Sequence, residues 1–195
     1  MKKRFIGISC MICMMALLVI SCGKADAEQP ESMETEVKTA EETEEKAAEE
    51  IEEIVENKMP SFTTMDLEGN VVTDDIFSQK DLTIVNVWGT YCGPCINEMP
   101  ELGEWAKELP ENVQLIGLVC DGYGNEDTAA LIVEQTGADY LQLIANEDFL
   151  GLFETIVGVP TTYFVDKDGN IVGEPIIGAY VDGYKNFVEG YFNGQ

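Results

Sequence analysis

Trp88-Gly89-Thr90-Tyr91-Cys92-Gly93-Pro94-Cys95 is the stretch that decides the fold. It follows the apolar run 82–87, which predicts a buried strand, and it precedes residues 96–109, which predict a helix. Two cysteines separated by two residues at a strand-to-helix junction indicate a dithiol/disulfide redox site. Unpaired backbone N–H groups at the helix amino terminus favour the thiolate form of Cys92, and the thiolate is the nucleophile. Cys95, one helical turn further on, would resolve the mixed disulfide.

A zinc site is the alternative explanation for paired cysteines. Closed structural zinc sites need four nitrogen or sulfur ligands. The chain has no histidine, and Cys120 is the only cysteine that follows Cys95. We therefore expect neither a metal ion nor an organic cofactor at this site.

The chain is strongly acidic: 37 Asp and Glu residues stand against 11 Lys and Arg, which gives a net charge of −26. Such a surface repels nucleic-acid phosphates and anionic lipid, so neither is an expected ligand. Solubility is the simplest explanation of the acidity, and a basic partner protein stays open.

Residues 1–21 have the layout of a signal peptide. Lys2-Lys3-Arg4 precede an apolar run over residues 5–20, which is short for a spanning helix. The run ends in Ser21-Cys22, which resembles a bacterial lipobox, where the cysteine is lipidated and becomes the mature amino terminus. We predict a lipid-anchored protein on the extracytoplasmic face of the bacterial cell membrane. An ordinary signal peptide or an uncleaved anchor is the alternative.

Residues 22–58 are predicted to form an acidic, disordered or partly helical tether. They are rich in Glu, Ala, Thr and Lys and contain no aromatic residue, which argues against a packed core. Repulsion between like charges would extend such a segment. Its apolar positions, around residues 51–55, are too few for a coiled coil. The folded domain is expected to span residues 59–195.

Strand and helix patterns alternate along this domain. The expected elements are a hairpin of 62–65 and 70–73, a capped helical turn at 74–77, strand 82–88, helix 96–109, strand 113–119, helix 125–135, strand 140–144, a helix to 156 capped by Asn146, a hairpin of 161–165 and 170–173, and a closing helix 184–192. This alternation predicts an α/β layer fold with helices on both sheet faces.

Together these features resemble thioredoxin-fold proteins of the TlpA/ResA type, which are membrane-tethered thiol-disulfide oxidoreductases facing away from the cytoplasm. The resemblance rests on residues 88–95, on Gly158-Val159-Pro160-Thr161, which looks like the cis-proline loop of that family, and on Glu98-Met99-Pro100, which looks like its Glu-x-Pro. It implies an α/β thioredoxin fold: a central mixed β-sheet flanked by helices, with an N-terminal β-hairpin extension and a mid-chain insertion around 121–144.

The resemblance also implies the substrate-binding residues. Pro160 would follow a cis peptide bond beside the disulfide, and the backbone of Val159 would pair with an extended substrate segment. An ordinary trans proline that opens a strand is the alternative. Gly93 and Pro94, between the two cysteines, would lie in the same groove. Trp88 and Tyr91 would pack around the motif and offer an apolar platform to the partner.

Glu98 is the expected proton-handling residue, because it lies three residues after Cys95 and near one helical turn from it. By the resemblance it would line the groove and take part in proton transfer during exchange; a solvated glutamate on a helix face is the alternative. Thioredoxin has a buried aspartate where this chain has Asn86, which cannot ionise. Cys120 ends a predicted buried strand and is expected to be an inert core thiol.

The implied activity is the reduction of disulfides in oxidised extracytoplasmic client proteins, with Cys92 and Cys95 as the dithiol. A membrane thiol donor of the CcdA/DsbD type would regenerate the pair. The Gly-Pro dipeptide matches thioredoxin and favours a reductase over a disulfide-forming oxidant. A peroxiredoxin-type peroxidase is disfavoured because Arg4 is the only arginine in the chain. A binding lipoprotein without enzymatic activity is the remaining alternative.

Overall fold

The computed structural model describes residues 57–194, which belong to the second of two compact units, Lys46–Gln195. The predictions for the signal peptide, for Cys22 and for the tether up to residue 56 lie outside these residues. Asn57 and Lys58 already join the domain: the carbonyl of Asn57 accepts a hydrogen bond from the amide of Ile171, and Lys58 bridges to Asn170. None of the helices in this described part has the length and apolar character needed to span a membrane.

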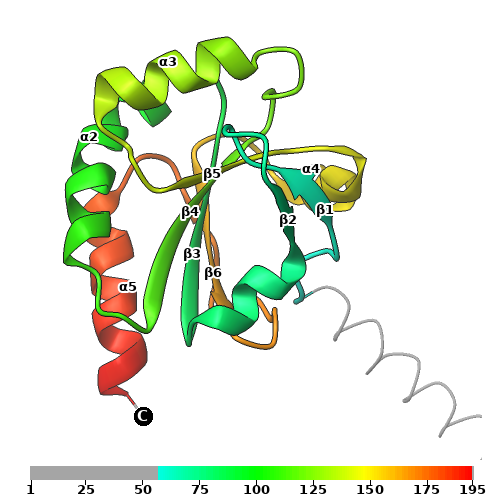
Figure 1. The fold of residues 1–195 in the computed structure, drawn as a ribbon. Coiled ribbons are helices and arrows are strands. Elements are labelled where there is room, and N and C mark those ends of the chain that lie inside the picture. Colours follow the sequence, from blue (N-terminus) through cyan, green and yellow to red (C-terminus); the bar gives the residue numbers. More distant parts are fainter. Residues whose placement is uncertain (1–56, 195) are drawn as a thin grey trace, which may run out of the picture. The chain divides into compact units, whose positions relative to one another are not determined.

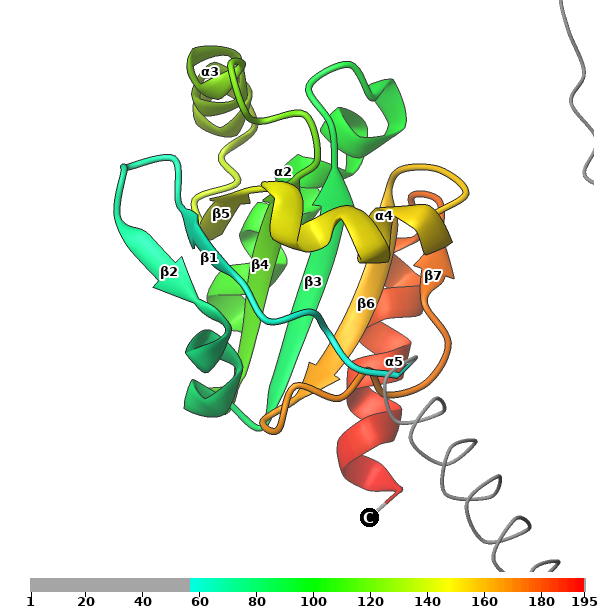
Figure 2. The ribbon, with the colours of Figure 1, turned by 90° about the vertical axis from the view of Figure 1, so that its right-hand side faces the viewer.

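A five-stranded mixed sheet forms the centre of the domain (Figure 2). Its strands, in spatial order, are β5 (Leu141–Ile144), β4 (Val113–Val119), β3 (Leu82–Trp88), β6 (Thr161–Asp166) and β7 (Ile176–Ile177). The first three are parallel, and β6 and β7 run antiparallel to their neighbours. All seven residues of β3 are buried, as expected for a strand covered on both faces.

Helices α2 (Gly93–Glu108) and α5 (Val181–Asn193) cover one face of the sheet, whereas α4 (Leu150–Thr155) and the β1–β2 hairpin lie over the other (Figure 1). Side chains alternate along β3, so Leu82 and Ile84 pack toward α2 and α5 while Val85 and Val87 pack toward the opposite face. The same alternation places Asn86 on the α2 face. This position becomes important for the functional site.

The predicted amino-terminal hairpin is confirmed as β1 (Thr63–Met65) and β2 (Val71–Thr73), which pair antiparallel. The mid-chain segment supplies α3 (Glu126–Thr136) and the edge strand β5. Gly137 ends α3 in the left-handed conformation, with φ of 68°, as a glycine after a helix commonly does. The thioredoxin fold with a hairpin extension is therefore present.

Several boundaries differ from the predictions. The turn after β2 is a 3₁₀ helix, η1 (Asp74–Gln79), with no side-chain cap, and the helix expected from Asn146 begins as a 3₁₀ turn, η2 (Glu147–Phe149). The second predicted hairpin forms only in part. Its return arm pairs with β6 through an isolated antiparallel bridge between Val165 and Ile171 and the flanking backbone hydrogen bonds, and it does not become a strand. The partner of β6 is instead β7, which lies further along the chain.

Candidate redox site

The redox site is built on the amino terminus of α2. Cys92 is the N-cap residue and forms a disulfide with Cys95, whose Cα lies 5.3 Å away. The amide of Cys95 also points at Cys92 Sγ, at a distance of 3.2 Å. Pro94 occupies the first helical turn, where its missing N–H costs no hydrogen bond. When the bond is reduced, amide groups of this helix end face the Cys92 sulfur and stabilise its thiolate.

The two sulfur-bearing residues differ in accessibility. Cys92 is 6% exposed and lies beside the exposed Gly93 and Pro94, whereas Cys95 has no exposed surface. Cys95 packs in an apolar cluster with Met99 and other buried side chains. A disulfide in another protein can therefore approach Cys92 and not Cys95, which assigns attack to the first cysteine and resolution to the second.

The cis peptide predicted between Val159 and Pro160 is confirmed. The carbonyl oxygen of Val159 lies 3.4 Å from Cys92 Sγ, so this loop is in direct contact with the reactive sulfur. The carbonyl of Pro160 accepts a hydrogen bond of 2.8 Å from the amide of Gly178. The loop between β7 and α5 is thus hydrogen-bonded to the cis-proline loop.

The two aromatic residues of the motif occupy different environments. Trp88 has no exposed surface, and its Nε1 donates a hydrogen bond of 2.9 Å to the side chain of Gln142. This corrects the expectation that Trp88 offers a platform to a partner, because burial reserves its side chain for packing. Tyr91 is 72% exposed and keeps the predicted position beside Cys92. The intervening loop is fixed by Asp121, which accepts hydrogen bonds from the amide and hydroxyl of Thr90.

Glu98 lies inside the protein, which excludes the alternative of a solvated helix-face glutamate. Its side chain is 6% exposed. Asn86 Nδ2 donates to Glu98 Oε1 at 2.9 Å, and the Tyr184 hydroxyl lies 3.1 Å from Glu98 Oε2. Burial raises the pKa of Glu98 to about 7, and the hydrogen bonds from Asn86 and Tyr184 oppose this shift. The carboxyl group can therefore gain or lose a proton near neutral pH.

Apart from Asn86, the residues that surround Glu98 were not singled out by the sequence. Tyr184 is fully buried on α5, and Thr162 on β6 accepts a hydrogen bond of 3.0 Å from Asn86 Nδ2. Two further polar atoms, Asn86 Oδ1 and the Tyr140 hydroxyl, are buried without a hydrogen-bond partner within residues 57–194. The apolar periodicity of residues 181–193 indicates that Tyr184 faces the core, but no local signal indicates that it reaches Glu98.

Cys120 is less buried than predicted. It is a half-buried free thiol directly after β4, and its sulfur lies 3.8 Å from the exposed Tyr91 hydroxyl. Burial raises the pKa of this thiol, so it is a poor nucleophile at neutral pH. Cys120 packs against the edge of the core, and its inertness stays a prediction.

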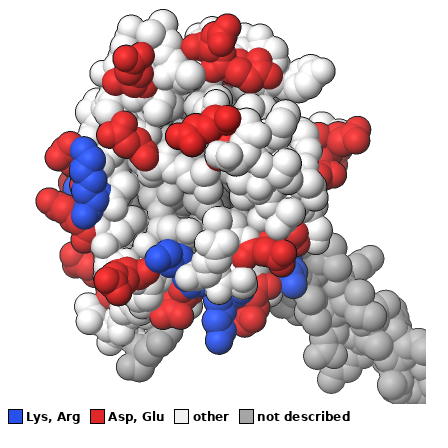
Figure 3. Space-filling model, viewed as in Figure 1, with Lys and Arg blue, Asp and Glu red and all other residues white. Residues whose placement is uncertain are grey.

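Charge near the site comes from acidic side chains. In Figure 3 the charged side chains on the upper part of the visible face are Asp and Glu, in separate patches, whereas the lysines lie lower on it and toward the left edge, beside further acidic side chains. The loops 89–92, 120–125 and 156–160 contain neither lysine nor arginine. A cationic side chain from these loops is thus not what stabilises the Cys92 thiolate, which leaves the helix terminus as the main source.

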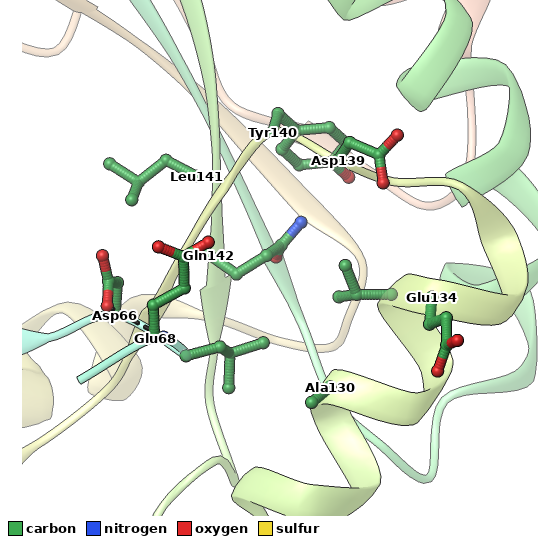
Figure 4. A pocket seen from close by; sticks show the side chains of 10 residues that line it. Asp66, Glu68, Ala130, Glu134, Asp139, Tyr140, Leu141 and Gln142 are labelled. Atoms are coloured by element: carbon green, nitrogen blue, oxygen red, sulfur yellow. Dashed lines mark hydrogen bonds between the residues drawn. The ribbon is translucent and has the colours of Figure 1, made fainter. Parts of the chain in front are cut away.

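A cavity of about 590 Å³ lies between α3, β5 and the turn of the hairpin (Figure 4). Acidic side chains, among them Glu68, Glu134 and Asp139, line it together with apolar ones. No group of three or more Cys, Asp or Glu side chains within residues 57–194 is arranged to hold a metal ion. The lining includes neither of the paired cysteines nor the cis-proline loop, so this cavity is separate from the redox chemistry.

Comparison with known proteins agrees with this geometry. The AhpC/TSA family matches residues 55–173. The chain is 31% identical to a thiol-disulfide oxidoreductase ResA of Bacillus thuringiensis, over 70% of this chain and 76% of the relative. It is 33% identical to a thiol:disulfide interchange protein DsbE of Vibrio cholerae, over 60% and 62% of the two chains.

Solved structures give the same result for the fold. The thioredoxin domain of a thiol-disulfide oxidoreductase from Bacteroides vulgatus superposes with a TM-score of 0.58 and 26% identity, covering 69% of this chain and 94% of that domain. A thiol:disulfide interchange protein from a Bacteroides species matches with a TM-score of 0.58 and 28% identity, over 70% and 89% of the chains.

Proposed function

Because the chain belongs to the AhpC/TSA family and is a thiol-disulfide oxidoreductase with a Cys92–Cys95 pair, we propose that it reduces disulfides of client proteins outside the cytoplasm while tethered to the membrane. The observation that carries the proposal is the position of Cys92. It caps α2, is the only one of the paired cysteines with exposed surface, and touches the Val159 carbonyl.

The proposed reaction starts from the dithiol. The Cys92 thiolate attacks one sulfur of the client disulfide, so a mixed disulfide forms and the other client sulfur leaves as a thiolate. Cys95 then loses its proton and attacks Cys92 Sγ, which releases the second client thiolate and forms the Cys92–Cys95 disulfide. Two electrons and two protons pass to the client. The disulfide in this structure corresponds to the product state.

Glu98 is the proposed acceptor for the Cys95 proton. It follows Cys95 by three residues on the same helix, and burial raises its pKa to about 7. A base with a pKa near the working pH is the most effective proton acceptor. We expect exchange to slow at a pH well below 7, where Glu98 is protonated.

The reduction potential of the pair tests the direction of electron flow. Equilibration of the purified chain with dithiothreitol or glutathione, followed by counting of free thiols, gives the value. A potential below about −230 mV would support a reductase, and one above about −150 mV would make the protein an oxidant of exported clients.

Substitution of single cysteines tests the assignment of roles. Cys92→Ser should abolish reduction of a disulfide substrate, and Cys120→Ser is the matched control that should retain it. Cys95→Ser should accumulate a mixed disulfide through Cys92 and so capture the client for identification. Activity retained by Cys92→Ser would overturn the mechanism and favour a role in binding alone.

The tether and the electron donor are parts of the same proposal. The lipobox-like Ser21-Cys22 supports a lipid anchor, and an extracytoplasmic dithiol needs a thiol donor in the membrane, here proposed to be of the CcdA/DsbD type. Cys22→Ser should release the protein from the membrane fraction of a bacterial host. If the variant stays with the membrane, a different anchor holds the chain.

A further inference from the structure

The Tyr184 hydroxyl is the point where three structural elements meet. It lies 3.1 Å from Glu98 Oε2 on α2 and 2.8 Å from the carbonyl oxygen of Gly178, in the loop before α5. It also accepts a hydrogen bond of 3.2 Å from the amide of Tyr180. These contacts are inside the protein, since both Tyr184 and Glu98 are buried. A hydroxyl has one proton to donate and two lone pairs, so it cannot donate to Glu98 and to Gly178 at the same time.

We propose that Tyr184 is a positioning residue that links the protonation of Glu98 to the loop that holds Pro160 beside Cys92. This inference rests on the proposed function, in which Glu98 exchanges protons with the site. It adds a hydrogen-bonded connection between the Glu98 carboxyl group and the substrate-binding loop.

When Glu98 is ionised, its carboxylate can only accept, so Tyr184 donates its proton to Oε2. A hydrogen bond to a charged group is the stronger one, and the Gly178 carbonyl then loses this donor. When Glu98 is protonated, Asn86 still donates to Oε1, so the acid proton sits on Oε2 and points to Tyr184. Tyr184 accepts that proton and donates its own to Gly178.

Two short contacts connect Gly178 to the reactive sulfur of Cys92. The amide of the same residue donates to the Pro160 carbonyl at 2.8 Å. The preceding Val159 carbonyl lies 3.4 Å from Cys92 Sγ. Loss or gain of the bond from Tyr184 therefore changes the hydrogen bonding of Gly178, the residue that bonds to the cis-proline loop. Gly178 has φ of 89°, a conformation that favours glycine, so the loop geometry here is specific.

Other groups that face Glu98 do not provide this link. The neutral neighbours are Asn86 of β3 and Thr162 of β6, which bond to each other. The titratable neighbours are Glu101 of α2, Tyr140 ahead of β5, and Tyr184 itself. Glu101 is paired with Lys185 at 2.7 Å, and the Tyr140 hydroxyl has no hydrogen-bond partner within residues 57–194. The amide of Tyr180, in the same loop, also faces Glu98 and acts to lower its pKa. Within residues 57–194, however, Tyr184 is the side chain that contacts both Glu98 Oε2 and the Gly178 carbonyl.

The disulfide form of the full-length chain is the right sample for the test, because Cys92 and Cys95 cannot titrate in it. The ¹³C shifts of the Glu98 carboxyl and of the Gly178 carbonyl are followed by NMR from pH 5 to pH 9. In the wild type we expect both signals to change with one midpoint near pH 7. Glu98→Gln should remove the change at the Gly178 carbonyl.

Tyr184→Phe removes only the hydroxyl. The Gly178 carbonyl should then stop responding to pH, and the Glu98 midpoint should rise by about one pH unit because the carboxylate loses a donor. Tyr163→Phe is the matched control. Tyr163 is also buried, but it packs on the opposite sheet face and bonds to Thr155, so both signals should titrate as in the wild type.

An unchanged Glu98 midpoint in Tyr184→Phe would overturn the inference. So would a Gly178 carbonyl that does not change with pH in the wild type, a result that decides the matter even if Tyr184→Phe does not fold. Thiol exchange with oxidised glutathione is measured separately on the same variants. If the Glu98 and Gly178 signals titrate together but Glu98→Gln exchanges at the wild-type rate at every pH, the link stands and the proposed role of Glu98 in proton transfer fails.

Discussion

Glu98 and Asp66 have nearly the same solvent exposure, 6% and 7%, yet their pKa values move in opposite directions. Glu98 lies much deeper in the protein than Asp66, which is close to the surface. Burial raises the pKa of Glu98 to about 7, since two side-chain donors only partly offset it. Burial also acts to raise the pKa of Asp66, but hydrogen bonds from the side chain and amide of Asn70 and from the amide of Glu68 bring it below its usual value. These three bonds measure 2.9, 2.8 and 2.9 Å.

The difference teaches that the depth of burial and the supply of donors together decide the role of a carboxylate. Asp66 draws its donors from its own turn, at most four residues away, so the carboxylate and its partners form together. Glu98 draws its donors from Asn86 and Tyr184, which are 12 and 86 residues away. The local turn stabilises a permanent charge, whereas the tertiary site leaves a carboxyl group that can still exchange its proton.

Glu98→Gln should have the largest effect of these substitutions, on the pH dependence of the free energy of unfolding. The native state holds the Glu98 proton up to about pH 7, while the unfolded chain releases it near pH 4.5. The free energy of unfolding of the wild type therefore falls as pH rises through this window, by ~3 kcal/mol, and the variant lacks this fall. Urea unfolding at pH 4 and pH 9 measures it. If wild type and variant lose the same free energy of unfolding between pH 4 and pH 9, the pKa of Glu98 is not raised in the native state.

Asp66→Asn should act in the opposite sense. Because the native pKa of Asp66 is lowered, its stabilisation is present above the pKa of the unfolded chain and is lost as pH falls through the native value. The variant should lose ~2 kcal/mol of unfolding free energy at pH 7 and much less at pH 2, since a neutral amide accepts these bonds more weakly.

Asp166→Asn provides the control for that experiment. Asp166 makes the same three contacts, with the amides of Asp168 and Asn170 and with Asn170 Nδ2, each at 2.9 Å. It is only half-buried, so the loss of stability should be smaller than for Asp66→Asn. Equal losses at both turns would mean that burial of Asp66 contributes nothing.

Asn86→Ala should have the smallest effect of these substitutions, on the pKa of Glu98. Removal of the donor to Oε1 should raise the pKa of Glu98 further above 7, by about one unit, or ~1.4 kcal/mol. The ¹³C titration of the Glu98 carboxyl reports the shift. Gln114→Ala removes a side-chain amide from the neighbouring strand, where it bonds to Thr83, and should leave the titration unchanged. A shift of the same size in both variants would point to a general loosening of the sheet.

The two turns also show which features of the fold the local sequence can predict. Asp66-Leu67-Glu68-Gly69-Asn70 and Asp166-Lys167-Asp168-Gly169-Asn170 share their Asp, Gly and Asn positions, and their glycines have φ of 85° and 82°. Both were predictable as turns for this reason. Only the first closes a hairpin of two strands, because the chain after the second turn leaves β6 after one bridge and returns as β7.

The site divides in the same way. The positions of Cys92 and Cys95 at a strand-to-helix junction could be predicted, because a buried apolar run and the cysteine spacing are local signals. The cis peptide before Pro160 came from the resemblance and is confirmed. The full burial of Trp88 could not be predicted, since it depends on Gln142, which lies 54 residues away on β5.

The sequence by itself determined the strands β3 and β4, the helix that starts at the cysteine pair, and the turns around Gly69 and Gly169. Each of these depends on residues close in the chain, whose periodicity and backbone preferences act before folding is complete. Only the tertiary structure decided that Glu98 is buried against Asn86 and Tyr184 and keeps a pKa of about 7. That environment exists only when β3, α2 and α5 pack together, because burial and long-range hydrogen bonds are properties of the assembled layers.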